Sequence, residues 1–222
     1  MSFRWGRAFL SQLHQLSLQP ACALCKRPAA GVMCVDCSHQ LAGCQISTAL
    51  EVQNDGLPLL AWGHYSGFLK QALAQLKYNQ KPEIGQFLGQ QLGMMWLASH
   101  NHLSRPVVLP IPLHQRREQE RGYNQATLIA NGFCHVTGLT LISNGLIRRR
   151  ATQAQFNLTA QERFTNVARA FRLEPTFLRQ AYQKPILLLD DIYTTGATIH
   201  SATQTLKEAD LQVAGTIVVA RA

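Results

Sequence analysis

The sequence lacks the long apolar segments of membrane and secreted proteins. No stretch of its 222 residues approaches the roughly 18 consecutive apolar residues that a membrane span needs. Residues 1–19 carry leucines at helical spacing, but polar side chains interrupt them, so no hydrophobic region of a signal peptide is present. We therefore expect no membrane span and a cytoplasmic location, in which the six cysteines stay reduced.

Charged residues are also scarce, at 15% of the chain against 46% hydrophobic residues. A disordered chain has the opposite balance, so the sequence predicts a globular protein with a substantial core. Among the charged residues the acidic ones are fewer, with 12 Asp and Glu against 21 Lys and Arg. Residues 105–184 hold 12 basic and 4 acidic side chains, a local net charge of +8. Such an excess indicates either a polyanionic ligand, nucleic acid or a phosphorylated small molecule, or a solvated basic surface.

Hydrophobic periodicity divides the chain into three parts. Residues 1–19 are predicted to form an amphipathic helix, residues 20–46 a cysteine-rich module, and residues 47–222 an α/β domain. Within that domain the spacing predicts helices at 68–76, 84–96, 123–133 and 199–209, and strands at 107–109, 186–189 and 213–220. Alternating strands and helices predict a parallel sheet with right-handed crossovers.

Four cysteines form two CxxC pairs, Cys22 with Cys25 and Cys34 with Cys37. Two such pairs, each on a tight turn, are typical of a tetrahedral site with four thiolates. We expect a structural Zn²⁺ in a small zinc-ribbon-like module, with an iron–sulfur cluster as the alternative for the same ligands. Cys44 is a candidate for a spare or alternative ligand. A metal with four protein ligands has no open position, so it would stabilise the module and not catalyse.

A buried strand at 186–189 leads into two adjacent carboxylates, Asp190 and Asp191, and then into a loop of small polar residues. Ligands of open α/β sheets bind at such strand ends, and backbone N–H groups at a helix N-terminus can surround a phosphate. The residues predicted to bind phosphate are Thr194, Thr195, Gly196, Ala197 and Thr198. The acids would then accept from ribose hydroxyls or bind Mg²⁺. A plain helix cap is the alternative, and a Walker loop is excluded because no Gly-Lys-Ser/Thr is present.

At these residues the chain resembles the phosphoribosyltransferases, whose signature is an apolar strand, two acids and a Thr/Gly-rich loop. The run 109–125, together with the four-cysteine module and residues of 149–171, is similar to the ComF/GntX family. These bacterial phosphoribosyltransferase-like proteins are linked to competence and to the use of external DNA. The resemblance implies a phosphoribosyltransferase-type parallel sheet with flanking helices. It also implies contacts from Asp190 and Asp191 to the ribose of phosphoribosyl pyrophosphate.

The basic residues acquire predicted roles from that resemblance. A pyrophosphate needs planar, paired donors, so we expect Arg117, Arg121 and Asn124 on the pyrophosphate side of the site. His114 and Lys77 are either ligand contacts or surface residues. The stretch from Arg148 to Arg163 is predicted to form a flexible loop that closes over substrate, and the alternative is a nucleic-acid surface. Its family-pattern residues are Arg149, Thr152, Gln155 and Arg163.

The sequence therefore favours a phosphoribosyltransferase-like protein that binds phosphoribosyl pyrophosphate with Mg²⁺. No motif identifies the acceptor, whose pocket we expect in a hood formed by residues 47–105. The expected role lies in DNA uptake and utilisation or in nucleotide metabolism. The alternative is a non-catalytic sensor of a phosphoribosyl ligand, or a protein that binds single-stranded DNA or the DNA-uptake machinery.

Overall fold

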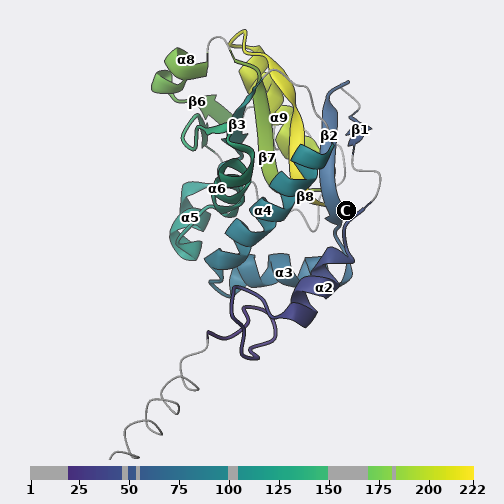
Figure 1. The fold of residues 1–222 in the computed structure, drawn as a ribbon. Coiled ribbons are helices and arrows are strands. Elements are labelled where there is room, and N and C mark those ends of the chain that lie inside the picture. The colour runs from purple at the N-terminus through teal and green to yellow at the C-terminus, as the bar shows by residue number, and fades with distance from the viewer. Residues whose placement is uncertain (1–19, 47–49, 54–55, 100–104, 150–169, 182–183) are drawn as a thin grey trace, which may run out of the picture.

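A six-stranded sheet forms the centre of the protein in the computed structural model, which describes residues 20–46, 50–53, 56–99, 105–149, 170–181 and 184–222 (Figure 1). The strand order is β1-β2-β8-β7-β3-β4, and every neighbouring pair is parallel except β1 with β2. The strands are β1 (Leu50–Val52), β2 (Pro58–His64), β3 (Val107–Pro110), β4 (Thr140–Leu141), β7 (Ile186–Tyr193) and β8 (Val213–Arg221). This mostly parallel sheet confirms the predicted fold class.

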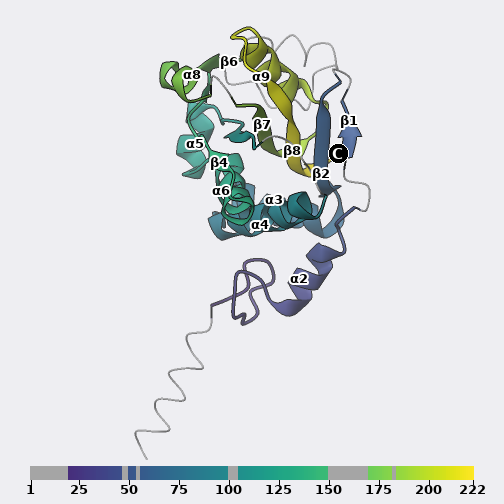
Figure 2. The same ribbon diagram turned by 45° about the horizontal axis from the view of Figure 1, so that its top comes forward.

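Helices cover both faces of the sheet. One face carries α3 (Gly67–Tyr78), α4 (Pro82–Ala98) and α6 (Gln125–Thr137), and the other carries α9 (Ala197–Lys207) (Figure 2). Beside α9 pack α8 (Pro175–Ala181) and a two-stranded antiparallel sheet of β5 (Leu146–Arg148) and β6 (Phe171–Leu173). The predicted helices and strands are thus present. Those expected at 68–76 and 84–96 extend a few residues further, and the one expected at 123–133 begins at Gln125 and ends at Thr137.

The direction in which successive strands are added across the sheet reverses between β3 and β7, although these two strands are parallel. The crossover from β3 through α6 leads outward to β4, whereas the crossover from β7 through α9 leads back to β8. Right-handed crossovers that run in opposite directions place their helices on opposite faces, as observed. The strand ends between them therefore leave a crevice, which is where ligands bind in open parallel sheets.

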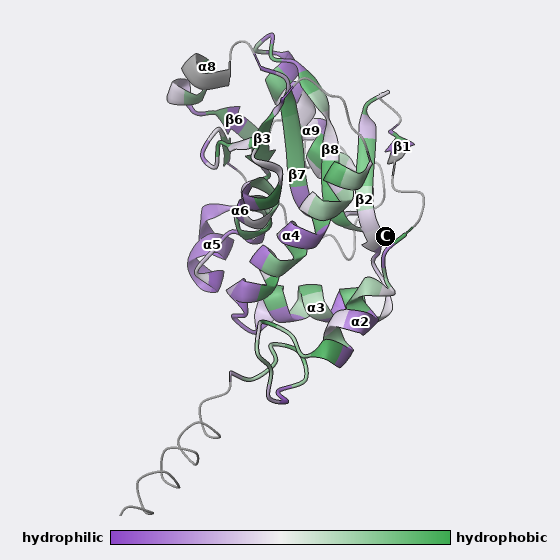
Figure 3. Ribbon diagram, viewed as in Figure 1, coloured by the Kyte–Doolittle hydropathy of each residue, from purple (hydrophilic) through white to green (hydrophobic). Residues whose placement is uncertain are grey.

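Side-chain polarity follows these layers. Hydrophobic residues fill the central strands, and Ile186 to Leu189 of β7 are at most 1% exposed (Figure 3). Such burial on both faces is typical of a parallel strand. In contrast, α5 (Gln115–Arg121) is almost wholly hydrophilic and has no buried residue (Figure 3). In the part of the chain that the structure describes, no helix has the length and apolar character to cross a membrane.

Glycines allow α4 and α6 to pack closely. A Cβ added at Gly89 would lie 2.0 Å from the carbonyl oxygen of Ile129, and one at Gly132 would lie 2.1 Å from that of Gln86. Only a residue without a side chain fits between two backbones at this separation. Trp96 and Phe133 extend the contact with an edge-to-face pair whose ring centroids are 5.8 Å apart.

The described part of the predicted hood contributes to the main sheet and its core. β2 pairs with β8 in the centre of the sheet, and the buried face of α4 joins the core under it. The cysteine module, which includes α2 (Val35–Ala42), packs on the same core through Cys22, Cys37 and Leu41. The amphipathic helix expected at 1–19 lies outside the described residues.

Candidate functional site

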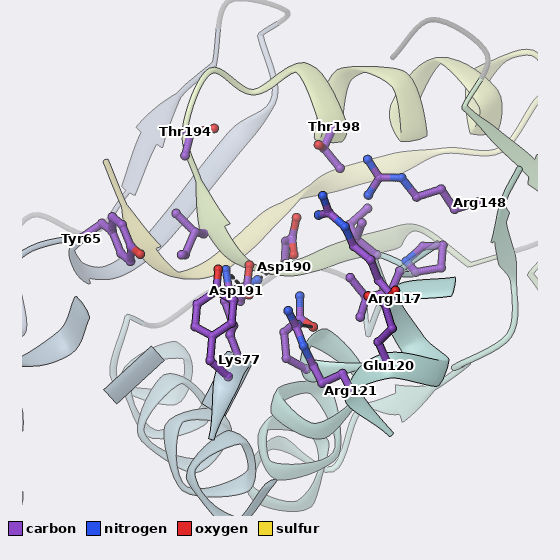
Figure 4. A pocket seen from close by; sticks show the side chains of 16 residues that line it. Tyr65, Lys77, Arg117, Glu120, Arg121, Arg148, Asp190, Asp191, Thr194 and Thr198 are labelled. Carbon is purple, nitrogen blue, oxygen red and sulfur yellow. Dashed lines mark hydrogen bonds and ion pairs between the residues drawn. The ribbon is translucent and has the colours of Figure 1, made fainter. Parts of the chain in front are cut away.

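A cavity of about 760 Å³ opens at the carboxyl ends of the parallel strands. Its walls come from the ends of β2, β3 and β7, from the last turn of α3, from α5 and from the start of α9 (Figure 4). This cavity is the crevice between the carboxyl ends of β3 and β7, where the direction of strand addition reverses. The lining residues are Tyr65, Lys77, Tyr78, Ile111, Pro112, Leu113, Arg117, Glu120, Arg121, Gln125, Arg148, Asp190, Asp191, Ile192, Thr194 and Thr198.

The two predicted acids lie side by side in the middle of this cavity (Figure 4). Side chains alternate along a strand, so Asp191 shares the face of Leu189, toward α3. Its Oδ2 lies 2.7 Å from Nζ of Lys77, and the two side chains are only 7% and 17% exposed. Asp190 is less enclosed, and its Oδ1 accepts a hydrogen bond from the backbone N–H of Asp191 at 2.8 Å.

The acids are electrostatically unequal. Burial, followed by the negative charge of Asp191, raises the pKa of Asp190 to about 8. For Lys77, burial acts to lower the pKa, but the charge and hydrogen bond of Asp191 outweigh it, so the net pKa is raised. A firmly charged lysine therefore balances one carboxylate, while Asp190 retains a proton that a bound cation or polar ligand can displace.

The loop after β7 leads directly into α9. Thr194 and Thr198 line the cavity, Thr195 is exposed, and the methyl group of Ala197 is buried in the core. Gly196 begins the helix with a φ of +76°, and a Cβ there would lie 2.3 Å from the hydroxyl of Tyr193. No side chain caps α9. Its first N–H groups thus remain available to an anion at the threonine end of the cavity.

The arginines lie on a short helix, α5, which the sequence analysis did not predict. α5 begins with a hydrogen bond from the N–H of Arg116 to Nδ1 of His114 at 3.3 Å, and it ends at Gly122, whose φ is +84°. An ion pair between Arg116 and Glu120 at 2.9 Å adds support along the helix. The segment has no apolar periodicity, so only its two ends could have indicated a helix. Arg117 and Arg121 face the cavity, as expected of ligand contacts (Figure 4).

Asn124 caps the N-terminus of α6. Its Oδ1 accepts from the N–H of Ala126 and its Nδ2 donates to the carbonyl of Ile111, both at 3.0 Å. The side chain is 8% exposed and is absent from the cavity wall. Asn124 therefore ties the loop after β3 to the start of α6, and its expected contact with pyrophosphate stays a prediction.

Three cavity residues were missed or left open by the sequence analysis. Lys77 is in the cavity and not on the surface, although its distant partner gave no local signal. Arg148, expected in the flexible loop, lies in β5 with its guanidinium 5.5 Å above the ring of Phe171. Tyr65 had no sequence signal beyond its place after a strand. Of the residues predicted for the loop, Arg149 is exposed beside β5, whereas Thr152, Gln155 and Arg163 lie outside the described residues.

The four cysteines converge as their spacing predicted. All four Sγ atoms lie within 4.8 Å of one another, which suits a single metal ion. The first pair lies on a turn, whereas Cys34 is the N-cap of α2 and Cys37 lies in its first turn. Cys44 is outside this group, and its Sγ donates to the carbonyl of Gln40 at 3.4 Å.

The surroundings of the exposed cysteine, Cys25, favour its thiolate form. A hydrogen bond from Arg27 lowers the pKa of Cys25 to about 6. Burial, followed by hydrogen bonding with the neighbouring thiols, raises the pKa of Cys37 to about 12. Coordination to a metal cation would favour the thiolate form, because thiolate is the form that coordinates. The donor set thus fits a thiolate-binding metal with no open position.

Several known bacterial proteins are similar to the chain. No protein-family model matches it. It is 30% identical over 190 residues to the competence protein ComFC of Bacillus subtilis, which covers 84% of this chain and 71% of that protein. It is 30% identical over 151 residues to the DNA utilization protein YhgH of Salmonella typhi, covering 67% of this chain and 65% of that protein. Competence protein F of Haemophilus influenzae is 27% identical over 152 residues.

The fold and the site define an α/β protein with a polar cavity at the carboxyl edge of a parallel sheet and an N-terminal four-cysteine cluster. Together with these identities, they show that the chain belongs to the ComF family. The matched region spans slightly less than two thirds of the Salmonella protein.

Proposed function

We propose that the cavity binds phosphoribosyl pyrophosphate together with Mg²⁺. The observation that carries the proposal is the arrangement of three kinds of group around one space. The carboxyl groups of Asp190 and Asp191, the uncapped start of α9 and the arginines of α5 all face the same cavity (Figure 4). A neutral or cationic ligand would leave the N–H groups at the start of α9 and the arginines of α5 without an anionic partner.

Each part of phosphoribosyl pyrophosphate matches one part of the cavity wall. The ribose hydroxyls would donate to Asp190 and Asp191, since carboxylates are acceptors. The 5-phosphate would receive hydrogen bonds from N–H groups at 195–198 and from the hydroxyls of Thr194 and Thr198. The pyrophosphate would lie toward Arg117 and Arg121, whose guanidinium groups donate in pairs. Mg²⁺ would arrive with the pyrophosphate and neutralise part of its charge.

The reaction that this arrangement supports is displacement of pyrophosphate from the ribose by a nitrogen nucleophile. The transition state has positive charge on the sugar and negative charge on the leaving group. Carboxylates beside the ribose and arginines beside the leaving group are on the matching sides. The walls otherwise act by orienting the reactants.

We further propose a role in the use or uptake of external DNA or in nucleotide salvage. The support is that similar proteins are named for DNA utilization and for competence. The alternative is a non-catalytic sensor of the same ligand, or direct binding of nucleic acid. For the cysteine cluster we propose one structural Zn²⁺, because four thiolates within 4.8 Å are the usual tetrahedral zinc site.

Calorimetric titration with phosphoribosyl pyrophosphate and Mg²⁺ tests the cavity. The intact chain should bind, and Asp190→Asn combined with Asp191→Asn should weaken binding about 10- to 100-fold, as expected for lost bonds to charged groups. Asp210→Asn is the matched control, because Asp210 is an exposed acid between α9 and β8 and is outside the cavity wall. No binding by the intact chain contradicts the proposal. Binding without pyrophosphate release, across a panel of bases and amines, favours the sensor.

A further inference from the structure

The cysteine cluster has a buried side and an open side. Cys22 and Cys37 are 0% and 2% exposed and belong to the main core. Cys25 is exposed, and Cys34 is partly exposed. Each CxxC pair thus contributes one inner and one outer ligand. A chelator or an oxidant from solution therefore meets Cys25 and Cys34 first.

One side chain, Arg27, bridges the two outer cysteines. Its Nε donates to Sγ of Cys25 at 3.3 Å, and its Nη2 donates to Sγ of Cys34 at 3.7 Å. Its Nη1 lies 2.8 Å from Oδ2 of Asp36, in the first turn of α2. The planar guanidinium has enough separate donors to make all three contacts at once, and an ammonium does not have this shape.

Charge and geometry give this contact a role. Four thiolates around a divalent ion carry a net charge of −2, and a fixed cation beside the sulfurs offsets part of it. Groups that hydrogen-bond to metal ligands orient them and strengthen binding, and their loss typically costs 10- to 100-fold in metal affinity. Asp36 adds a contact at the remaining nitrogen, Nη1, although the side chains of Arg27 and Asp36 are themselves 57% and 61% exposed.

We propose that Arg27 is a positioning residue of the metal site, which holds Cys25 and Cys34 in place and slows loss of the metal through the open side. The inference rests on the proposed Zn²⁺ site. Asp36 acts through Arg27 and contributes less, because its own side chain is 61% exposed.

The test measures metal release from the full chain loaded with one equivalent of Zn²⁺, by transfer to a coloured chelator. Arg27→Ala should release the metal about tenfold faster. Arg27→Lys should fall nearer to Arg27→Ala than to the unchanged chain, since the charge remains but the bridge is lost. Lys26→Asn is the matched control: it removes a neighbouring positive charge, and Asn tolerates the φ of +67° at that position.

A second readout separates positioning from folding. With Co²⁺ in place of Zn²⁺, loss of the hydrogen bonds should shift the thiolate-to-cobalt absorption bands in Arg27→Ala while circular dichroism stays unchanged. Equal release rates and unchanged bands in Arg27→Ala would overturn the role of Arg27. Equal acceleration in Lys26→Asn and Arg27→Ala would overturn it as well, in favour of general charge. A full chain that takes up no metal would contradict the site itself.

Discussion

Lys77 and Asp191 form an ion pair at 2.7 Å that joins the last turn of α3 to the carboxyl end of β7. The pair links α3, which shares a hydrophobic core with the cysteine module, to the strand that carries both acids of the cavity. It lies inside a cavity wall and is largely shielded from solvent. Its loss should therefore affect both the stability of the fold and the properties of the cavity.

Removal of Lys77 should destabilise the protein because it leaves a buried carboxylate without its partner. Lys77→Met keeps the aliphatic length and should lower the free energy of unfolding by about 2 kcal/mol. Adding Asp191→Asn should recover most of that loss, since the uncompensated charge is then gone. Urea unfolding of the single and double variants measures the coupling. Losses that simply add would show that the pair contributes no interaction energy.

Asp190 should make stability depend on pH. In an unfolded chain an aspartate titrates near 3.9, whereas burial and the charge of Asp191 raise the folded pKa to about 8. Between these values the folded state keeps a proton that the unfolded state has released. The contribution of Asp190 to the free energy of unfolding therefore falls as the pH rises from about 4 to about 8.

Comparison with Asp190→Asn isolates this effect from all other groups. The variant should gain stability relative to the unchanged chain as the pH rises from 5 to 8, because an amide does not titrate there. Urea unfolding at each pH gives the difference. A difference that stays constant over this range would contradict a raised pKa at Asp190.

Local patterns in the sequence were sufficient for part of this site. A run of apolar residues followed by Asp190 and Asp191 predicts a buried strand with acids at its end. A parallel strand is buried on both faces, so its consecutive residues are all apolar. The two CxxC pairs likewise predict a cluster, because each pair closes on itself in a single turn. The structure agrees with both.

Contacts between distant segments could not be predicted in this way. Lys77 has no neighbour in sequence that distinguishes a surface lysine from one buried against Asp191. Arg148 likewise has no local signal, because it begins a run of three arginines. Only the pairing of β5 with β6 places its guanidinium in the cavity wall. α5 was missed because its stability depends on its ends and on exposed ion pairs, which leave no hydrophobic period.

Close packing of α4 on α6 predicts a strong effect of a single methyl group. Gly89→Ala would place a Cβ 2.0 Å from a backbone oxygen of α6, so the helices must separate. The expected loss is about 3 kcal/mol in the free energy of unfolding, in the upper range for overpacked cores. Gly31→Ala is the control, since its Cβ would meet nothing within 4 Å. Thermal or urea unfolding distinguishes the two, and equal stabilities would contradict the packing.

Removal of the metal should loosen the core beyond the cysteine module. Cys22 and Cys37 lie in the same hydrophobic cluster as Leu69, Leu73 and Leu76 of α3, so a module that opens exposes that helix. Chelation, or Cys37→Ser, should abolish metal binding and lower the free energy of unfolding by about 2 kcal/mol or more. For a chain of this size that corresponds to roughly 4–8 °C in Tm.

Cys44→Ser provides the matched comparison, because Cys44 lies outside the group of four and its thiol contacts only a backbone carbonyl among the interactions described. The variant should keep one equivalent of metal and a Tm close to that of the unchanged chain, as measured by elemental analysis and calorimetry. Loss of metal from Cys44→Ser would instead make Cys44 a ligand. An unchanged Tm after complete chelation would show that the module's contacts with α3 persist without the ion.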